Sequence, residues 1–376
     1  MKARITDRKV LESLRPFEVS AYLRSTGWTL AGFMGESATV WNLGDRRVWL
    51  PQDIAFADYA RRLAEILETL AETESRSELE IVRDLATATA DVVRVRVASA
   101  LASDGSVSIE EGVRLFECSK DMLLSAARAA VAPRAYFRSR LPGPAEGYMR
   151  KVRLGQTEVG SYVVTLVCPV SPELQPAQSE LLQNVEEPFD RRVTRTLAGA
   201  LNKTAMAARD AGLRQDMEPF TAAVREGVSS NLCNALAEIG GGMEEGHIEV
   251  GFTWARSRKA PEGTISRVVI PYDAVPVMRE AARVLREIYA DNDFELAGPV
   301  VRLESADSAA GGEVLVYAEV DTWRRVKVYL GAHDYQLAVM AHKTGLEVSC
   351  RGRLEKEGRY FTLKDVRGFG VNEPIP

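Results

Sequence analysis

The chain has 376 residues, of which 46% are hydrophobic and 27% charged, and its formal net charge is −5. These values are ordinary for a globular protein, and the length predicts two or three domains rather than one core. The acidic balance gives no overall attraction to nucleic acid or to an anionic membrane, so binding to either would need a local basic patch. No apolar segment reaches the roughly 20 residues that span a bilayer, and the charged N-terminus lacks a signal core. We therefore expect no membrane association.

The cysteines and histidines limit the chemistry that this chain can carry. Four cysteines lie far apart with no paired spacing, which favours reduced thiols and a cytoplasmic location over disulfides or a zinc knuckle. With three histidines in all, we expect no metal site, and no motif predicts a cofactor. The cysteines are Cys118, Cys168, Cys233 and Cys350.

Residues 1–140 form the first predicted region, which mixes helices and strands. Phe17–Ser25 is predicted to be helical, and turn signals in residues 27–51 indicate a small β-meander. Apolar residues at helical spacing predict a second helix over Asp53–Thr73. A capping box then indicates a helix over residues 108–131.

Residues 141–293 form the second predicted region. Strands grouped on either side of a helix pair indicate an α+β layer rather than an alternating parallel sheet. The expected strands are Tyr148–Leu154, Gly160–Cys168, His247–Trp254 and Ser266–Ile270, and the expected helices are Arg191–Ala211, Glu218–Ile239 and Ala274–Ala290.

Residues 294–376 carry the clearest pattern in the chain, which is alternation of apolar and polar side chains in short segments. The predicted order is three strands, one helix and two strands: Val300–Glu304, Glu313–Val320, Arg325–Leu330, His333–Thr344, Leu346–Leu354 and Arg359–Asp365.

This order resembles the oligonucleotide/oligosaccharide-binding fold, or OB-fold, which is a five-stranded barrel. The resemblance covers only the last region, and it implies a nucleic-acid-binding module there. The predicted fold class is therefore α+β and multi-domain, with mixed helix/sheet N-terminal and central regions followed by a C-terminal five-stranded OB-like β-barrel.

Catalytic motifs are missing from the sequence. No glycine is followed by lysine, which excludes a phosphate loop, and no Gly-x-Ser-x-Gly nucleophile elbow occurs. Cys233 is the one candidate nucleophile, but we place it inside the helix predicted to begin near Glu218, as a buried structural thiol. We assign no catalytic residue and favour a non-enzyme, although a site of carboxylates and arginines alone would not show in the sequence.

The predicted barrel carries aromatic and basic residues on its outer face. If Val326, Val328 and Leu330 point to the core, their neighbours point outward. Residues 323–367 contain ten basic and five acidic residues. Single-stranded nucleic acid needs cations for its phosphates and aromatic rings for its bases, so this surface could bind it. The alternative interpretation is that these residues are the ordinary charged surface of a small barrel. The candidate binding residues are Tyr317, Arg325, Lys327, Tyr329, Arg351 and Arg353.

A second basic segment, residues 133–156, interleaves cations with aromatic side chains around a Pro-Gly-Pro break. Such an exposed junction could follow a phosphate backbone, or it could be an interdomain linker that packs on acidic neighbours. Its candidate residues are Arg138, Arg140, Arg150 and Lys151.

These patterns predict a non-catalytic protein that binds nucleic acid, either single-stranded or RNA, within a larger complex. The alternative is an interaction or scaffold subunit of a bacterial multi-protein system, such as an antiviral defence assembly, without nucleic-acid contact of its own. Protein partners are expected in both cases.

Overall fold

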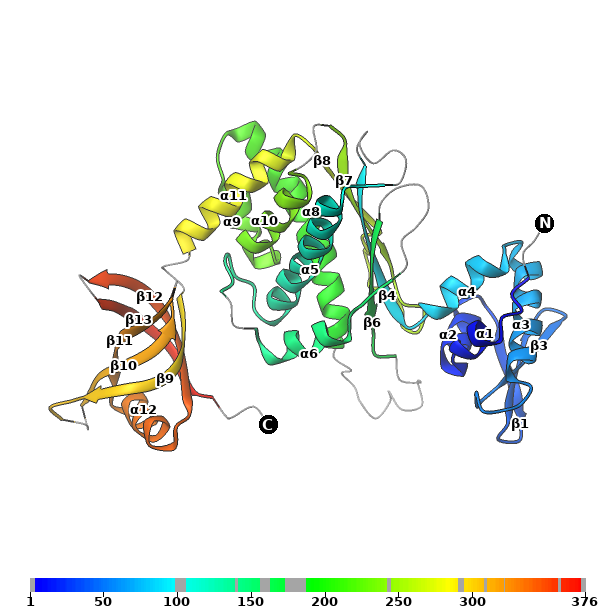
Figure 1. Ribbon diagram of the computed structural model, residues 1–376, viewed down its shortest axis with the longest axis horizontal. Helices are drawn as coiled ribbons and strands as arrows, with labels where there is room; N and C mark the ends of the chain where they lie inside the picture. The colour runs from blue at the N-terminus through cyan, green and yellow to red at the C-terminus, as the bar shows by residue number, and fades with distance from the viewer. Residues whose placement is uncertain are drawn as a thin grey trace.

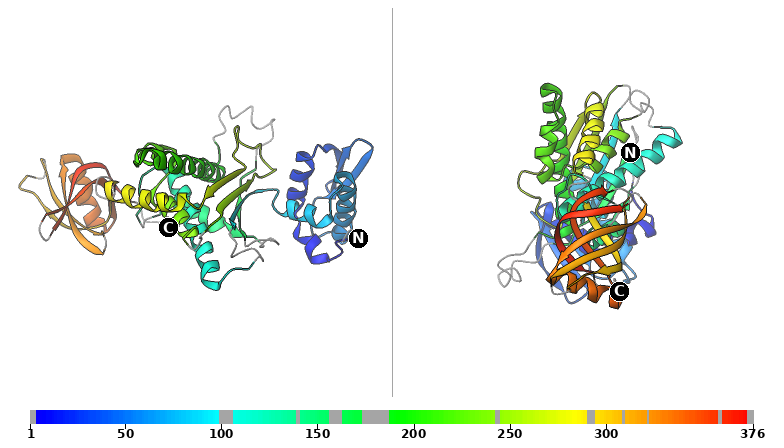
Figure 2. Two further views of the ribbon diagram at one scale, coloured as in Figure 1. Left: turned by 90° about the horizontal axis from the view of Figure 1, so that it is seen from above. Right: turned by 90° about the vertical axis from the view of Figure 1, so that its left-hand side faces the viewer.

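The computed structural model describes residues 4–98, 106–138, 141–155, 163–172, 187–241, 245–289, 294–307, 310–320, 322–357 and 360–372. Their buried hydrophobic side chains form three clusters, over residues 11–88, 93–285 and 294–363. We call the corresponding bodies the N-terminal lobe, the central lobe and the barrel. They lie in a row with the central lobe in the middle (Figures 1 and 2).

The N-terminal lobe has the expected helix–meander–helix order. A three-stranded antiparallel sheet of order β1-β2-β3 packs against its helices. A capping box between Ser77 and Glu80 begins a helix that the sequence analysis did not predict. The elements are α1 (Arg8–Ser13), α2 (Pro16–Ser25), β1 (Thr29–Met34), β2 (Ala38–Leu43), β3 (Arg46–Pro51), α3 (Tyr59–Glu74) and α4 (Glu78–Ala86).

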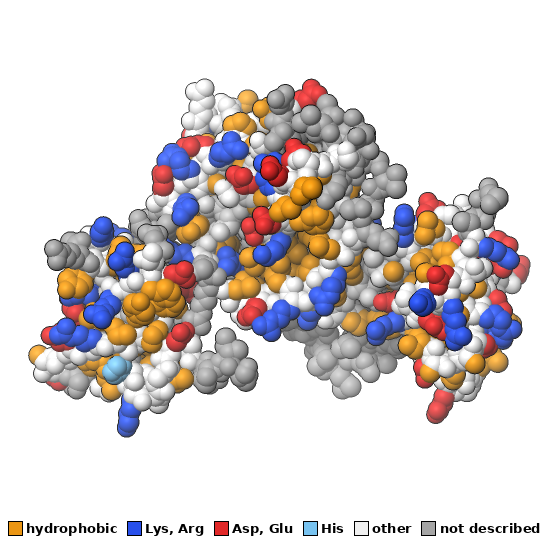
Figure 3. Space-filling view, viewed as in Figure 1, with side chains coloured by type: hydrophobic (Ala, Val, Ile, Leu, Met, Phe, Trp, Pro, Cys, Tyr) orange, Lys and Arg blue, Asp and Glu red, His pale blue; other side chains and the backbone are white. Residues whose placement is uncertain are grey.

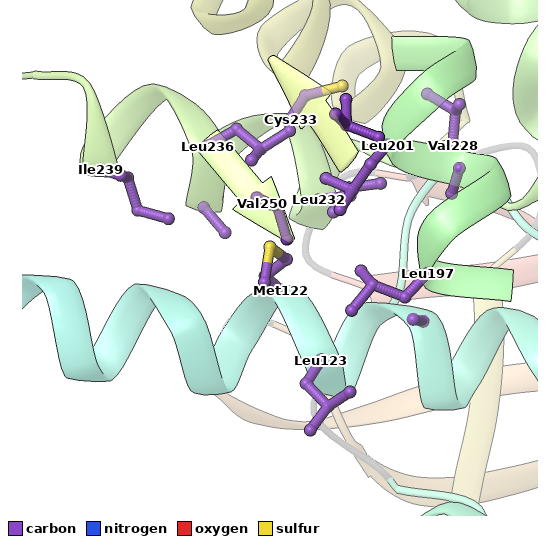
Figure 4. Packing of buried hydrophobic residues seen from close by; sticks show 14 of the residues in the cluster. Met122, Leu123, Leu197, Leu201, Val228, Leu232, Cys233, Leu236, Ile239 and Val250 are labelled. Carbon is purple, nitrogen blue, oxygen red and sulfur yellow. The ribbon is translucent and has the colours of Figure 1, made fainter. Parts of the chain in front are cut away.

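The central lobe is an antiparallel sheet of order β5-β6-β4-β7-β8 with its long helices gathered on one face (Figure 1). Figure 4 shows Met122, Leu201, Cys233 and Leu236 of three different helices meeting near Val250 of the sheet. The elements are β4 (Ala90–Ala98), α5 (Ile109–Val131), α6 (Gly143–Lys151), β5 (Arg153–Leu154), β6 (Val163–Pro169), α8 (Phe189–Arg214), α9 (Glu218–Ala222), η2 (Ala223–Glu226), α10 (Ser230–Ile239), β7 (His247–Thr253), β8 (Arg267–Pro271) and α11 (Ala274–Tyr289).

Two expected elements of this lobe are wrong. The predicted strand Tyr148–Leu154 is mostly the end of α6, and only Arg153 and Leu154 are extended. The predicted helix Glu218–Ile239 is broken at Gly227, whose φ is 97°. This positive φ favours glycine, and a Cβ would also crowd the Thr196 side chain of α8 at 3.1 Å.

The core clusters do not follow the expected limit at residue 140. Strand β4 and helix α5, which we expected in the first region, contribute side chains to the central core. The expected limit near residue 293 coincides with the change from the central core to the barrel core. The division into domains stays a prediction, and we propose to move its first boundary to about residue 89.

A buried ion pair fastens α8 to the central sheet. Asp91 of β4 and Arg191 of α8 are each 1% exposed, with 3.3 Å between a carboxylate oxygen and a guanidinium nitrogen. The Asp91 carboxylate also accepts hydrogen bonds from the Thr194 hydroxyl and, at 2.8 Å, from the backbone N–H of Ala255. The guanidinium lies over the Trp254 ring, 5.2 Å from its centroid. One carboxylate thus joins a strand, a helix and the segment after β7.

The barrel is closed, with five strands in the order β10-β11-β13-β12-β9, and it contains the expected helix. Its neighbours pair antiparallel except β11 and β13, which are parallel. This mixed five-stranded barrel is consistent with the OB-like resemblance. The elements are β9 (Phe294–Glu304), β10 (Gly311–Glu319), β11 (Trp323–Gly331), α12 (Ala332–Thr344), β12 (Glu347–Glu357) and β13 (Tyr360–Val371).

We predict that Asp91→Ala lowers the free energy of unfolding by about 3–5 kcal/mol, because it leaves the Arg191 charge buried without its carboxylate. Urea denaturation followed by circular dichroism measures this loss. The double variant Asp91→Ala/Arg191→Met should lose less than Asp91→Ala alone, because it also removes the buried charge. An equal or larger loss in the double variant would contradict this account of the ion pair.

Candidate nucleic-acid interface

The outer face of β10 and β11 presents a row of aromatic and charged side chains. Cross-strand partners place Glu313 opposite Tyr329, Leu315 opposite Lys327, Tyr317 opposite Arg325, and Glu319 opposite Trp323. Six residues of an antiparallel strand cover about 20 Å, which is the length of this row. The expected alternation is confirmed, since Val326, Val328 and Leu330 are buried. We call this row the β10–β11 face.

One end of the β10–β11 face is organised around Glu313. The Tyr329 hydroxyl donates a hydrogen bond of 2.8 Å to its carboxylate, and the Lys327 ammonium lies 3.1 Å from the other carboxylate oxygen. Burial favours the neutral acid, but the hydrogen bonds from Tyr329 and Lys327 outweigh it and hold the pKa of Glu313 below its usual value. Lys327 also lies 5.2 Å from the centre of the Tyr360 ring. Two tyrosines and a lysine therefore meet here, with a carboxylate that offsets the lysine charge.

The other end of the β10–β11 face is a pair of stacked rings. Tyr317 and Trp323 have centroids 5.3 Å apart and an interplanar angle of 29°. Trp323 is 53% exposed and Tyr317 is 39% exposed, so both keep ring surface open to solvent. Gly298 of β9 passes so close to this place that a Cβ would collide with the Tyr317 carbonyl oxygen. Only glycine allows this close approach of the β9 and β10 backbones.

A cavity of about 470 Å³ opens where the barrel meets the central lobe, and Trp323 lines it. Arg138 and Arg351, which the sequence analysis placed in different regions, line the same cavity. The Arg138 guanidinium lies 4.0 Å from the centre of the Phe294 ring and donates to the Val320 carbonyl at 3.1 Å. We call this cavity the junction pocket.

The side of the junction pocket that belongs to the central lobe is held rigidly. Residues 132–138, the junction segment, follow α5 and bond to the start of α10. The Asn231 side chain accepts from the Phe137 N–H at 2.8 Å and donates to the Phe137 carbonyl at 3.0 Å. The Ser230 N–H donates to the Ala135 carbonyl at 2.6 Å. Arg134 then reaches the barrel, where it pairs with Glu295 at 2.6 Å.

The remaining predicted residues lie elsewhere or are compensated by acids. Arg353 pairs with Glu355 at 3.1 Å and lies 3.6 Å from Asp365. At the end of α6, Arg150 pairs with Glu146 at 2.6 Å, and Lys151 lies 3.7 Å from Asp190. Arg140 lies outside the described residues. Figure 3 shows basic and acidic side chains interspersed over the visible face, without a large field of one sign.

Among the residues at this interface that were not selected from the sequence are Arg128, Trp323 and Tyr360. Trp323 begins β11 and precedes the predicted strand Arg325–Leu330, whereas Tyr360 lies within the predicted strand Arg359–Asp365 but was not selected as a ring for binding. Arg128 lies in the last turn of α5 and is only 9% exposed, and nothing in its helix marks it as facing another lobe. The sequence offered one signal for Trp323 as a binding residue, which is that it directly precedes two arginines, Arg324 and Arg325.

Cys233 is a buried thiol, although the expected reason was wrong. It lies in the first turn of α10, where Ser229 caps the helix, and not deep inside a longer helix. A helix N-terminus favours the thiolate, but here burial is stronger and raises the pKa of Cys233 to about 12. Cys233 is therefore not an activated nucleophile.

Other observations bear on the class of function. Within the described residues, no group of three or more His, Cys, Asp or Glu side chains could hold a metal ion. In the same part of the chain, each helix is too short or too polar to cross a membrane. Comparison with protein-family models, with curated proteins and with solved structures found no match.

We predict that Cys233 reacts with a thiol reagent roughly a thousandfold more slowly than an exposed cysteine at the same pH, because its raised pKa suppresses the thiolate. The time course of reaction with a chromogenic disulfide, in native buffer and in denaturant, measures this. Cys233→Ser is the matched control, and it should leave the native reaction unchanged. A fast native phase that this variant removes would show that the thiol is accessible.

Proposed function

We propose that this protein binds single-stranded nucleic acid, DNA or RNA, on the β10–β11 face without catalysing a reaction on it. The observation that carries the proposal is that aromatic rings stand at both ends of one face about 20 Å long, with two cations between them. Tyr329 is 61% exposed at one end, Lys327 and Arg325 follow, and the Tyr317–Trp323 pair stands at the other end.

The chemistry of this face suits a single strand better than a duplex. Stacking on an aromatic ring contributes about 1–3 kcal/mol per base and requires bases that are not already paired. The cations between the rings are placed for phosphates, whose contacts set affinity without reading sequence. The two strands of the face correspond to the second and third strands of an OB-fold, which form the usual ligand-binding surface of that barrel.

A second candidate function is that of an interaction subunit, and strand β1 favours it. Leu30, Phe33 and Met34 of β1 are exposed, and β1 is an edge strand of the described three-stranded sheet. Exposed apolar edge strands are open to pairing with another chain. The two functions are compatible, because the β1 edge and the β10–β11 face belong to different lobes. Membership of a bacterial defence assembly stays a prediction.

We predict that Tyr329→Ala weakens binding of an oligothymidylate by about 1–3 kcal/mol, because a stacking ring is lost. Tyr329→Phe is the matched control, since it keeps the ring and removes the hydroxyl that donates to Glu313. Its affinity should stay close to that of the wild type. Fluorescence anisotropy titration measures both, and equal losses in the two variants would contradict a stacking role.

Charge changes on the same face should act in opposite directions. Lys327→Ala should weaken binding to all sequences and lower the salt-dependence slope by about 0.7, the value for one phosphate contact on a single strand. Glu313→Gln should strengthen binding roughly fivefold, because it removes a carboxylate that repels phosphate and releases Lys327 from its ion pair. Titrations at two salt concentrations measure both effects. If wild-type protein binds neither DNA nor RNA at low salt, the proposal fails.

A further inference from the structure

The junction pocket has walls from two lobes. One wall comes from the end of α5 and the junction segment of the central lobe, and the other from β9, β12 and the β10–β11 hairpin of the barrel. Its volume of about 470 Å³ lies within the range of pockets that hold small molecules. The pocket begins where the β10–β11 face ends, because Trp323 belongs to both.

The pocket concentrates guanidinium groups. Arg128, Arg134, Arg138 and Arg351 line it, together with three glutamates. Arg134 pairs with Glu295 at 2.6 Å, and the lining as a whole carries four guanidiniums against three carboxylates. Guanidinium groups bind phosphate with two parallel hydrogen bonds and are weakly hydrated, so they suit a partly enclosed anion site.

Burial makes the charge of Arg128 costly. Its side chain is 9% exposed, and desolvation lowers its pKa below the usual value for arginine, although the group remains charged. A bound anion offsets part of that cost, since attraction between opposite charges is stronger where water is excluded. The carboxylates of Glu319 and Glu347 can accept hydrogen bonds from base amino groups or from sugar hydroxyls.

We propose that the junction pocket binds a nucleotide that carries a phosphate monoester, with its base stacked on Trp323 and its phosphate among Arg128, Arg138 and Arg351. This deepens the proposed function and rests on it for the source of the nucleotide. A strand laid along the β10–β11 face toward Trp323 meets the wall of the central lobe, so its terminal nucleotide occupies the pocket. A free mononucleotide offers the same chemistry.

The charge of a chain end distinguishes it from the interior of a strand. A phosphate monoester carries about −1.5 to −2 charges at pH 7, whereas an internal phosphodiester carries one. A pocket lined by more guanidiniums than carboxylates therefore prefers a phosphorylated end to a hydroxyl end. We expect a terminal phosphate to raise affinity about tenfold, the gain of one charge-assisted hydrogen bond.

The test uses the full-length protein and oligomers of deoxythymidine and of uridine of about 12 nucleotides, a length that one OB-fold can cover. Each oligomer carries a 5′-phosphate, a 3′-phosphate or no terminal phosphate, and an internal fluorophore reports anisotropy. Thymidine and uridine monophosphates, with the matching nucleosides, are titrated by calorimetry. Arg351→Gln removes a pocket guanidinium, and Trp323→Ala removes the ring.

Two matched variants control for general effects. Arg367→Gln changes the same charge on β13, directly opposite Arg351, at a residue that does not line the pocket. Trp323→Phe keeps an aromatic ring. The expected result is a gain from one terminal phosphate that Arg351→Gln and Trp323→Ala abolish and that both controls retain.

The other outcomes separate the two proposals. If the strand binds but a terminal phosphate adds nothing, or if Arg367→Gln removes the gain as fully as Arg351→Gln, the pocket proposal is overturned and the proposed function stands. If no strand binds but a monophosphate binds and Arg351→Gln abolishes it, the proposed function is overturned and the pocket takes a free nucleotide. Binding of neither overturns both.

Discussion

The buried Asp91 carboxylate is the interaction that joins the layers of the central lobe, from which the two other lobes extend. It holds Arg191 of α8, the Thr194 hydroxyl and the Ala255 backbone, so sheet and helix layer share one buried charge pair. The next residue, Arg256, pairs with Asp84 of the N-terminal lobe at 2.8 Å. Consecutive residues, Ala255 and Arg256, therefore contact the central ion pair and the N-terminal lobe. The Asp91–Arg191 pair matters most of these contacts because breaking a buried ion pair leaves an uncompensated charge.

The barrel could be predicted from the sequence because its core side chains alternate with polar ones along each strand. Val326, Val328 and Leu330 repeat with the period of a strand, and the same period places Lys327 and Tyr329 outside. In the central lobe, the secondary structure depends instead on contacts between residues that are far apart in the sequence. Tyr148 looks like a strand residue, yet it is buried on α6 against Phe189 of α8, with ring centroids 6.3 Å apart. No local pattern reports such a partner.

The candidate site also has one part that the sequence could predict and one part that it could not. The β10–β11 face was predictable, since it needs only strand pairing and side-chain direction. The junction pocket was not, because it forms where Arg128 and Arg138 of one lobe meet Arg351 of another. The net charge of the chain was also a poor guide to which ligands it can bind. An acidic chain can hold a basic pocket because screening confines the influence of exposed charges to about 10 Å, so local composition decides what binds.

Because the junction pocket lies between two lobes, a ligand bound in it contacts both the central lobe and the barrel. Arg134–Glu295 and Arg138–Val320 already connect the junction segment to the barrel across the pocket. A phosphate held by Arg138 and Arg351 adds a further link between the same two lobes, and a ligand that binds one arrangement stabilises that arrangement by mass action. Because the Asn231 side chain ties the junction segment to α10, that added rigidity reaches the helix layer. Occupation of the pocket thus couples the orientation of the barrel to the central core.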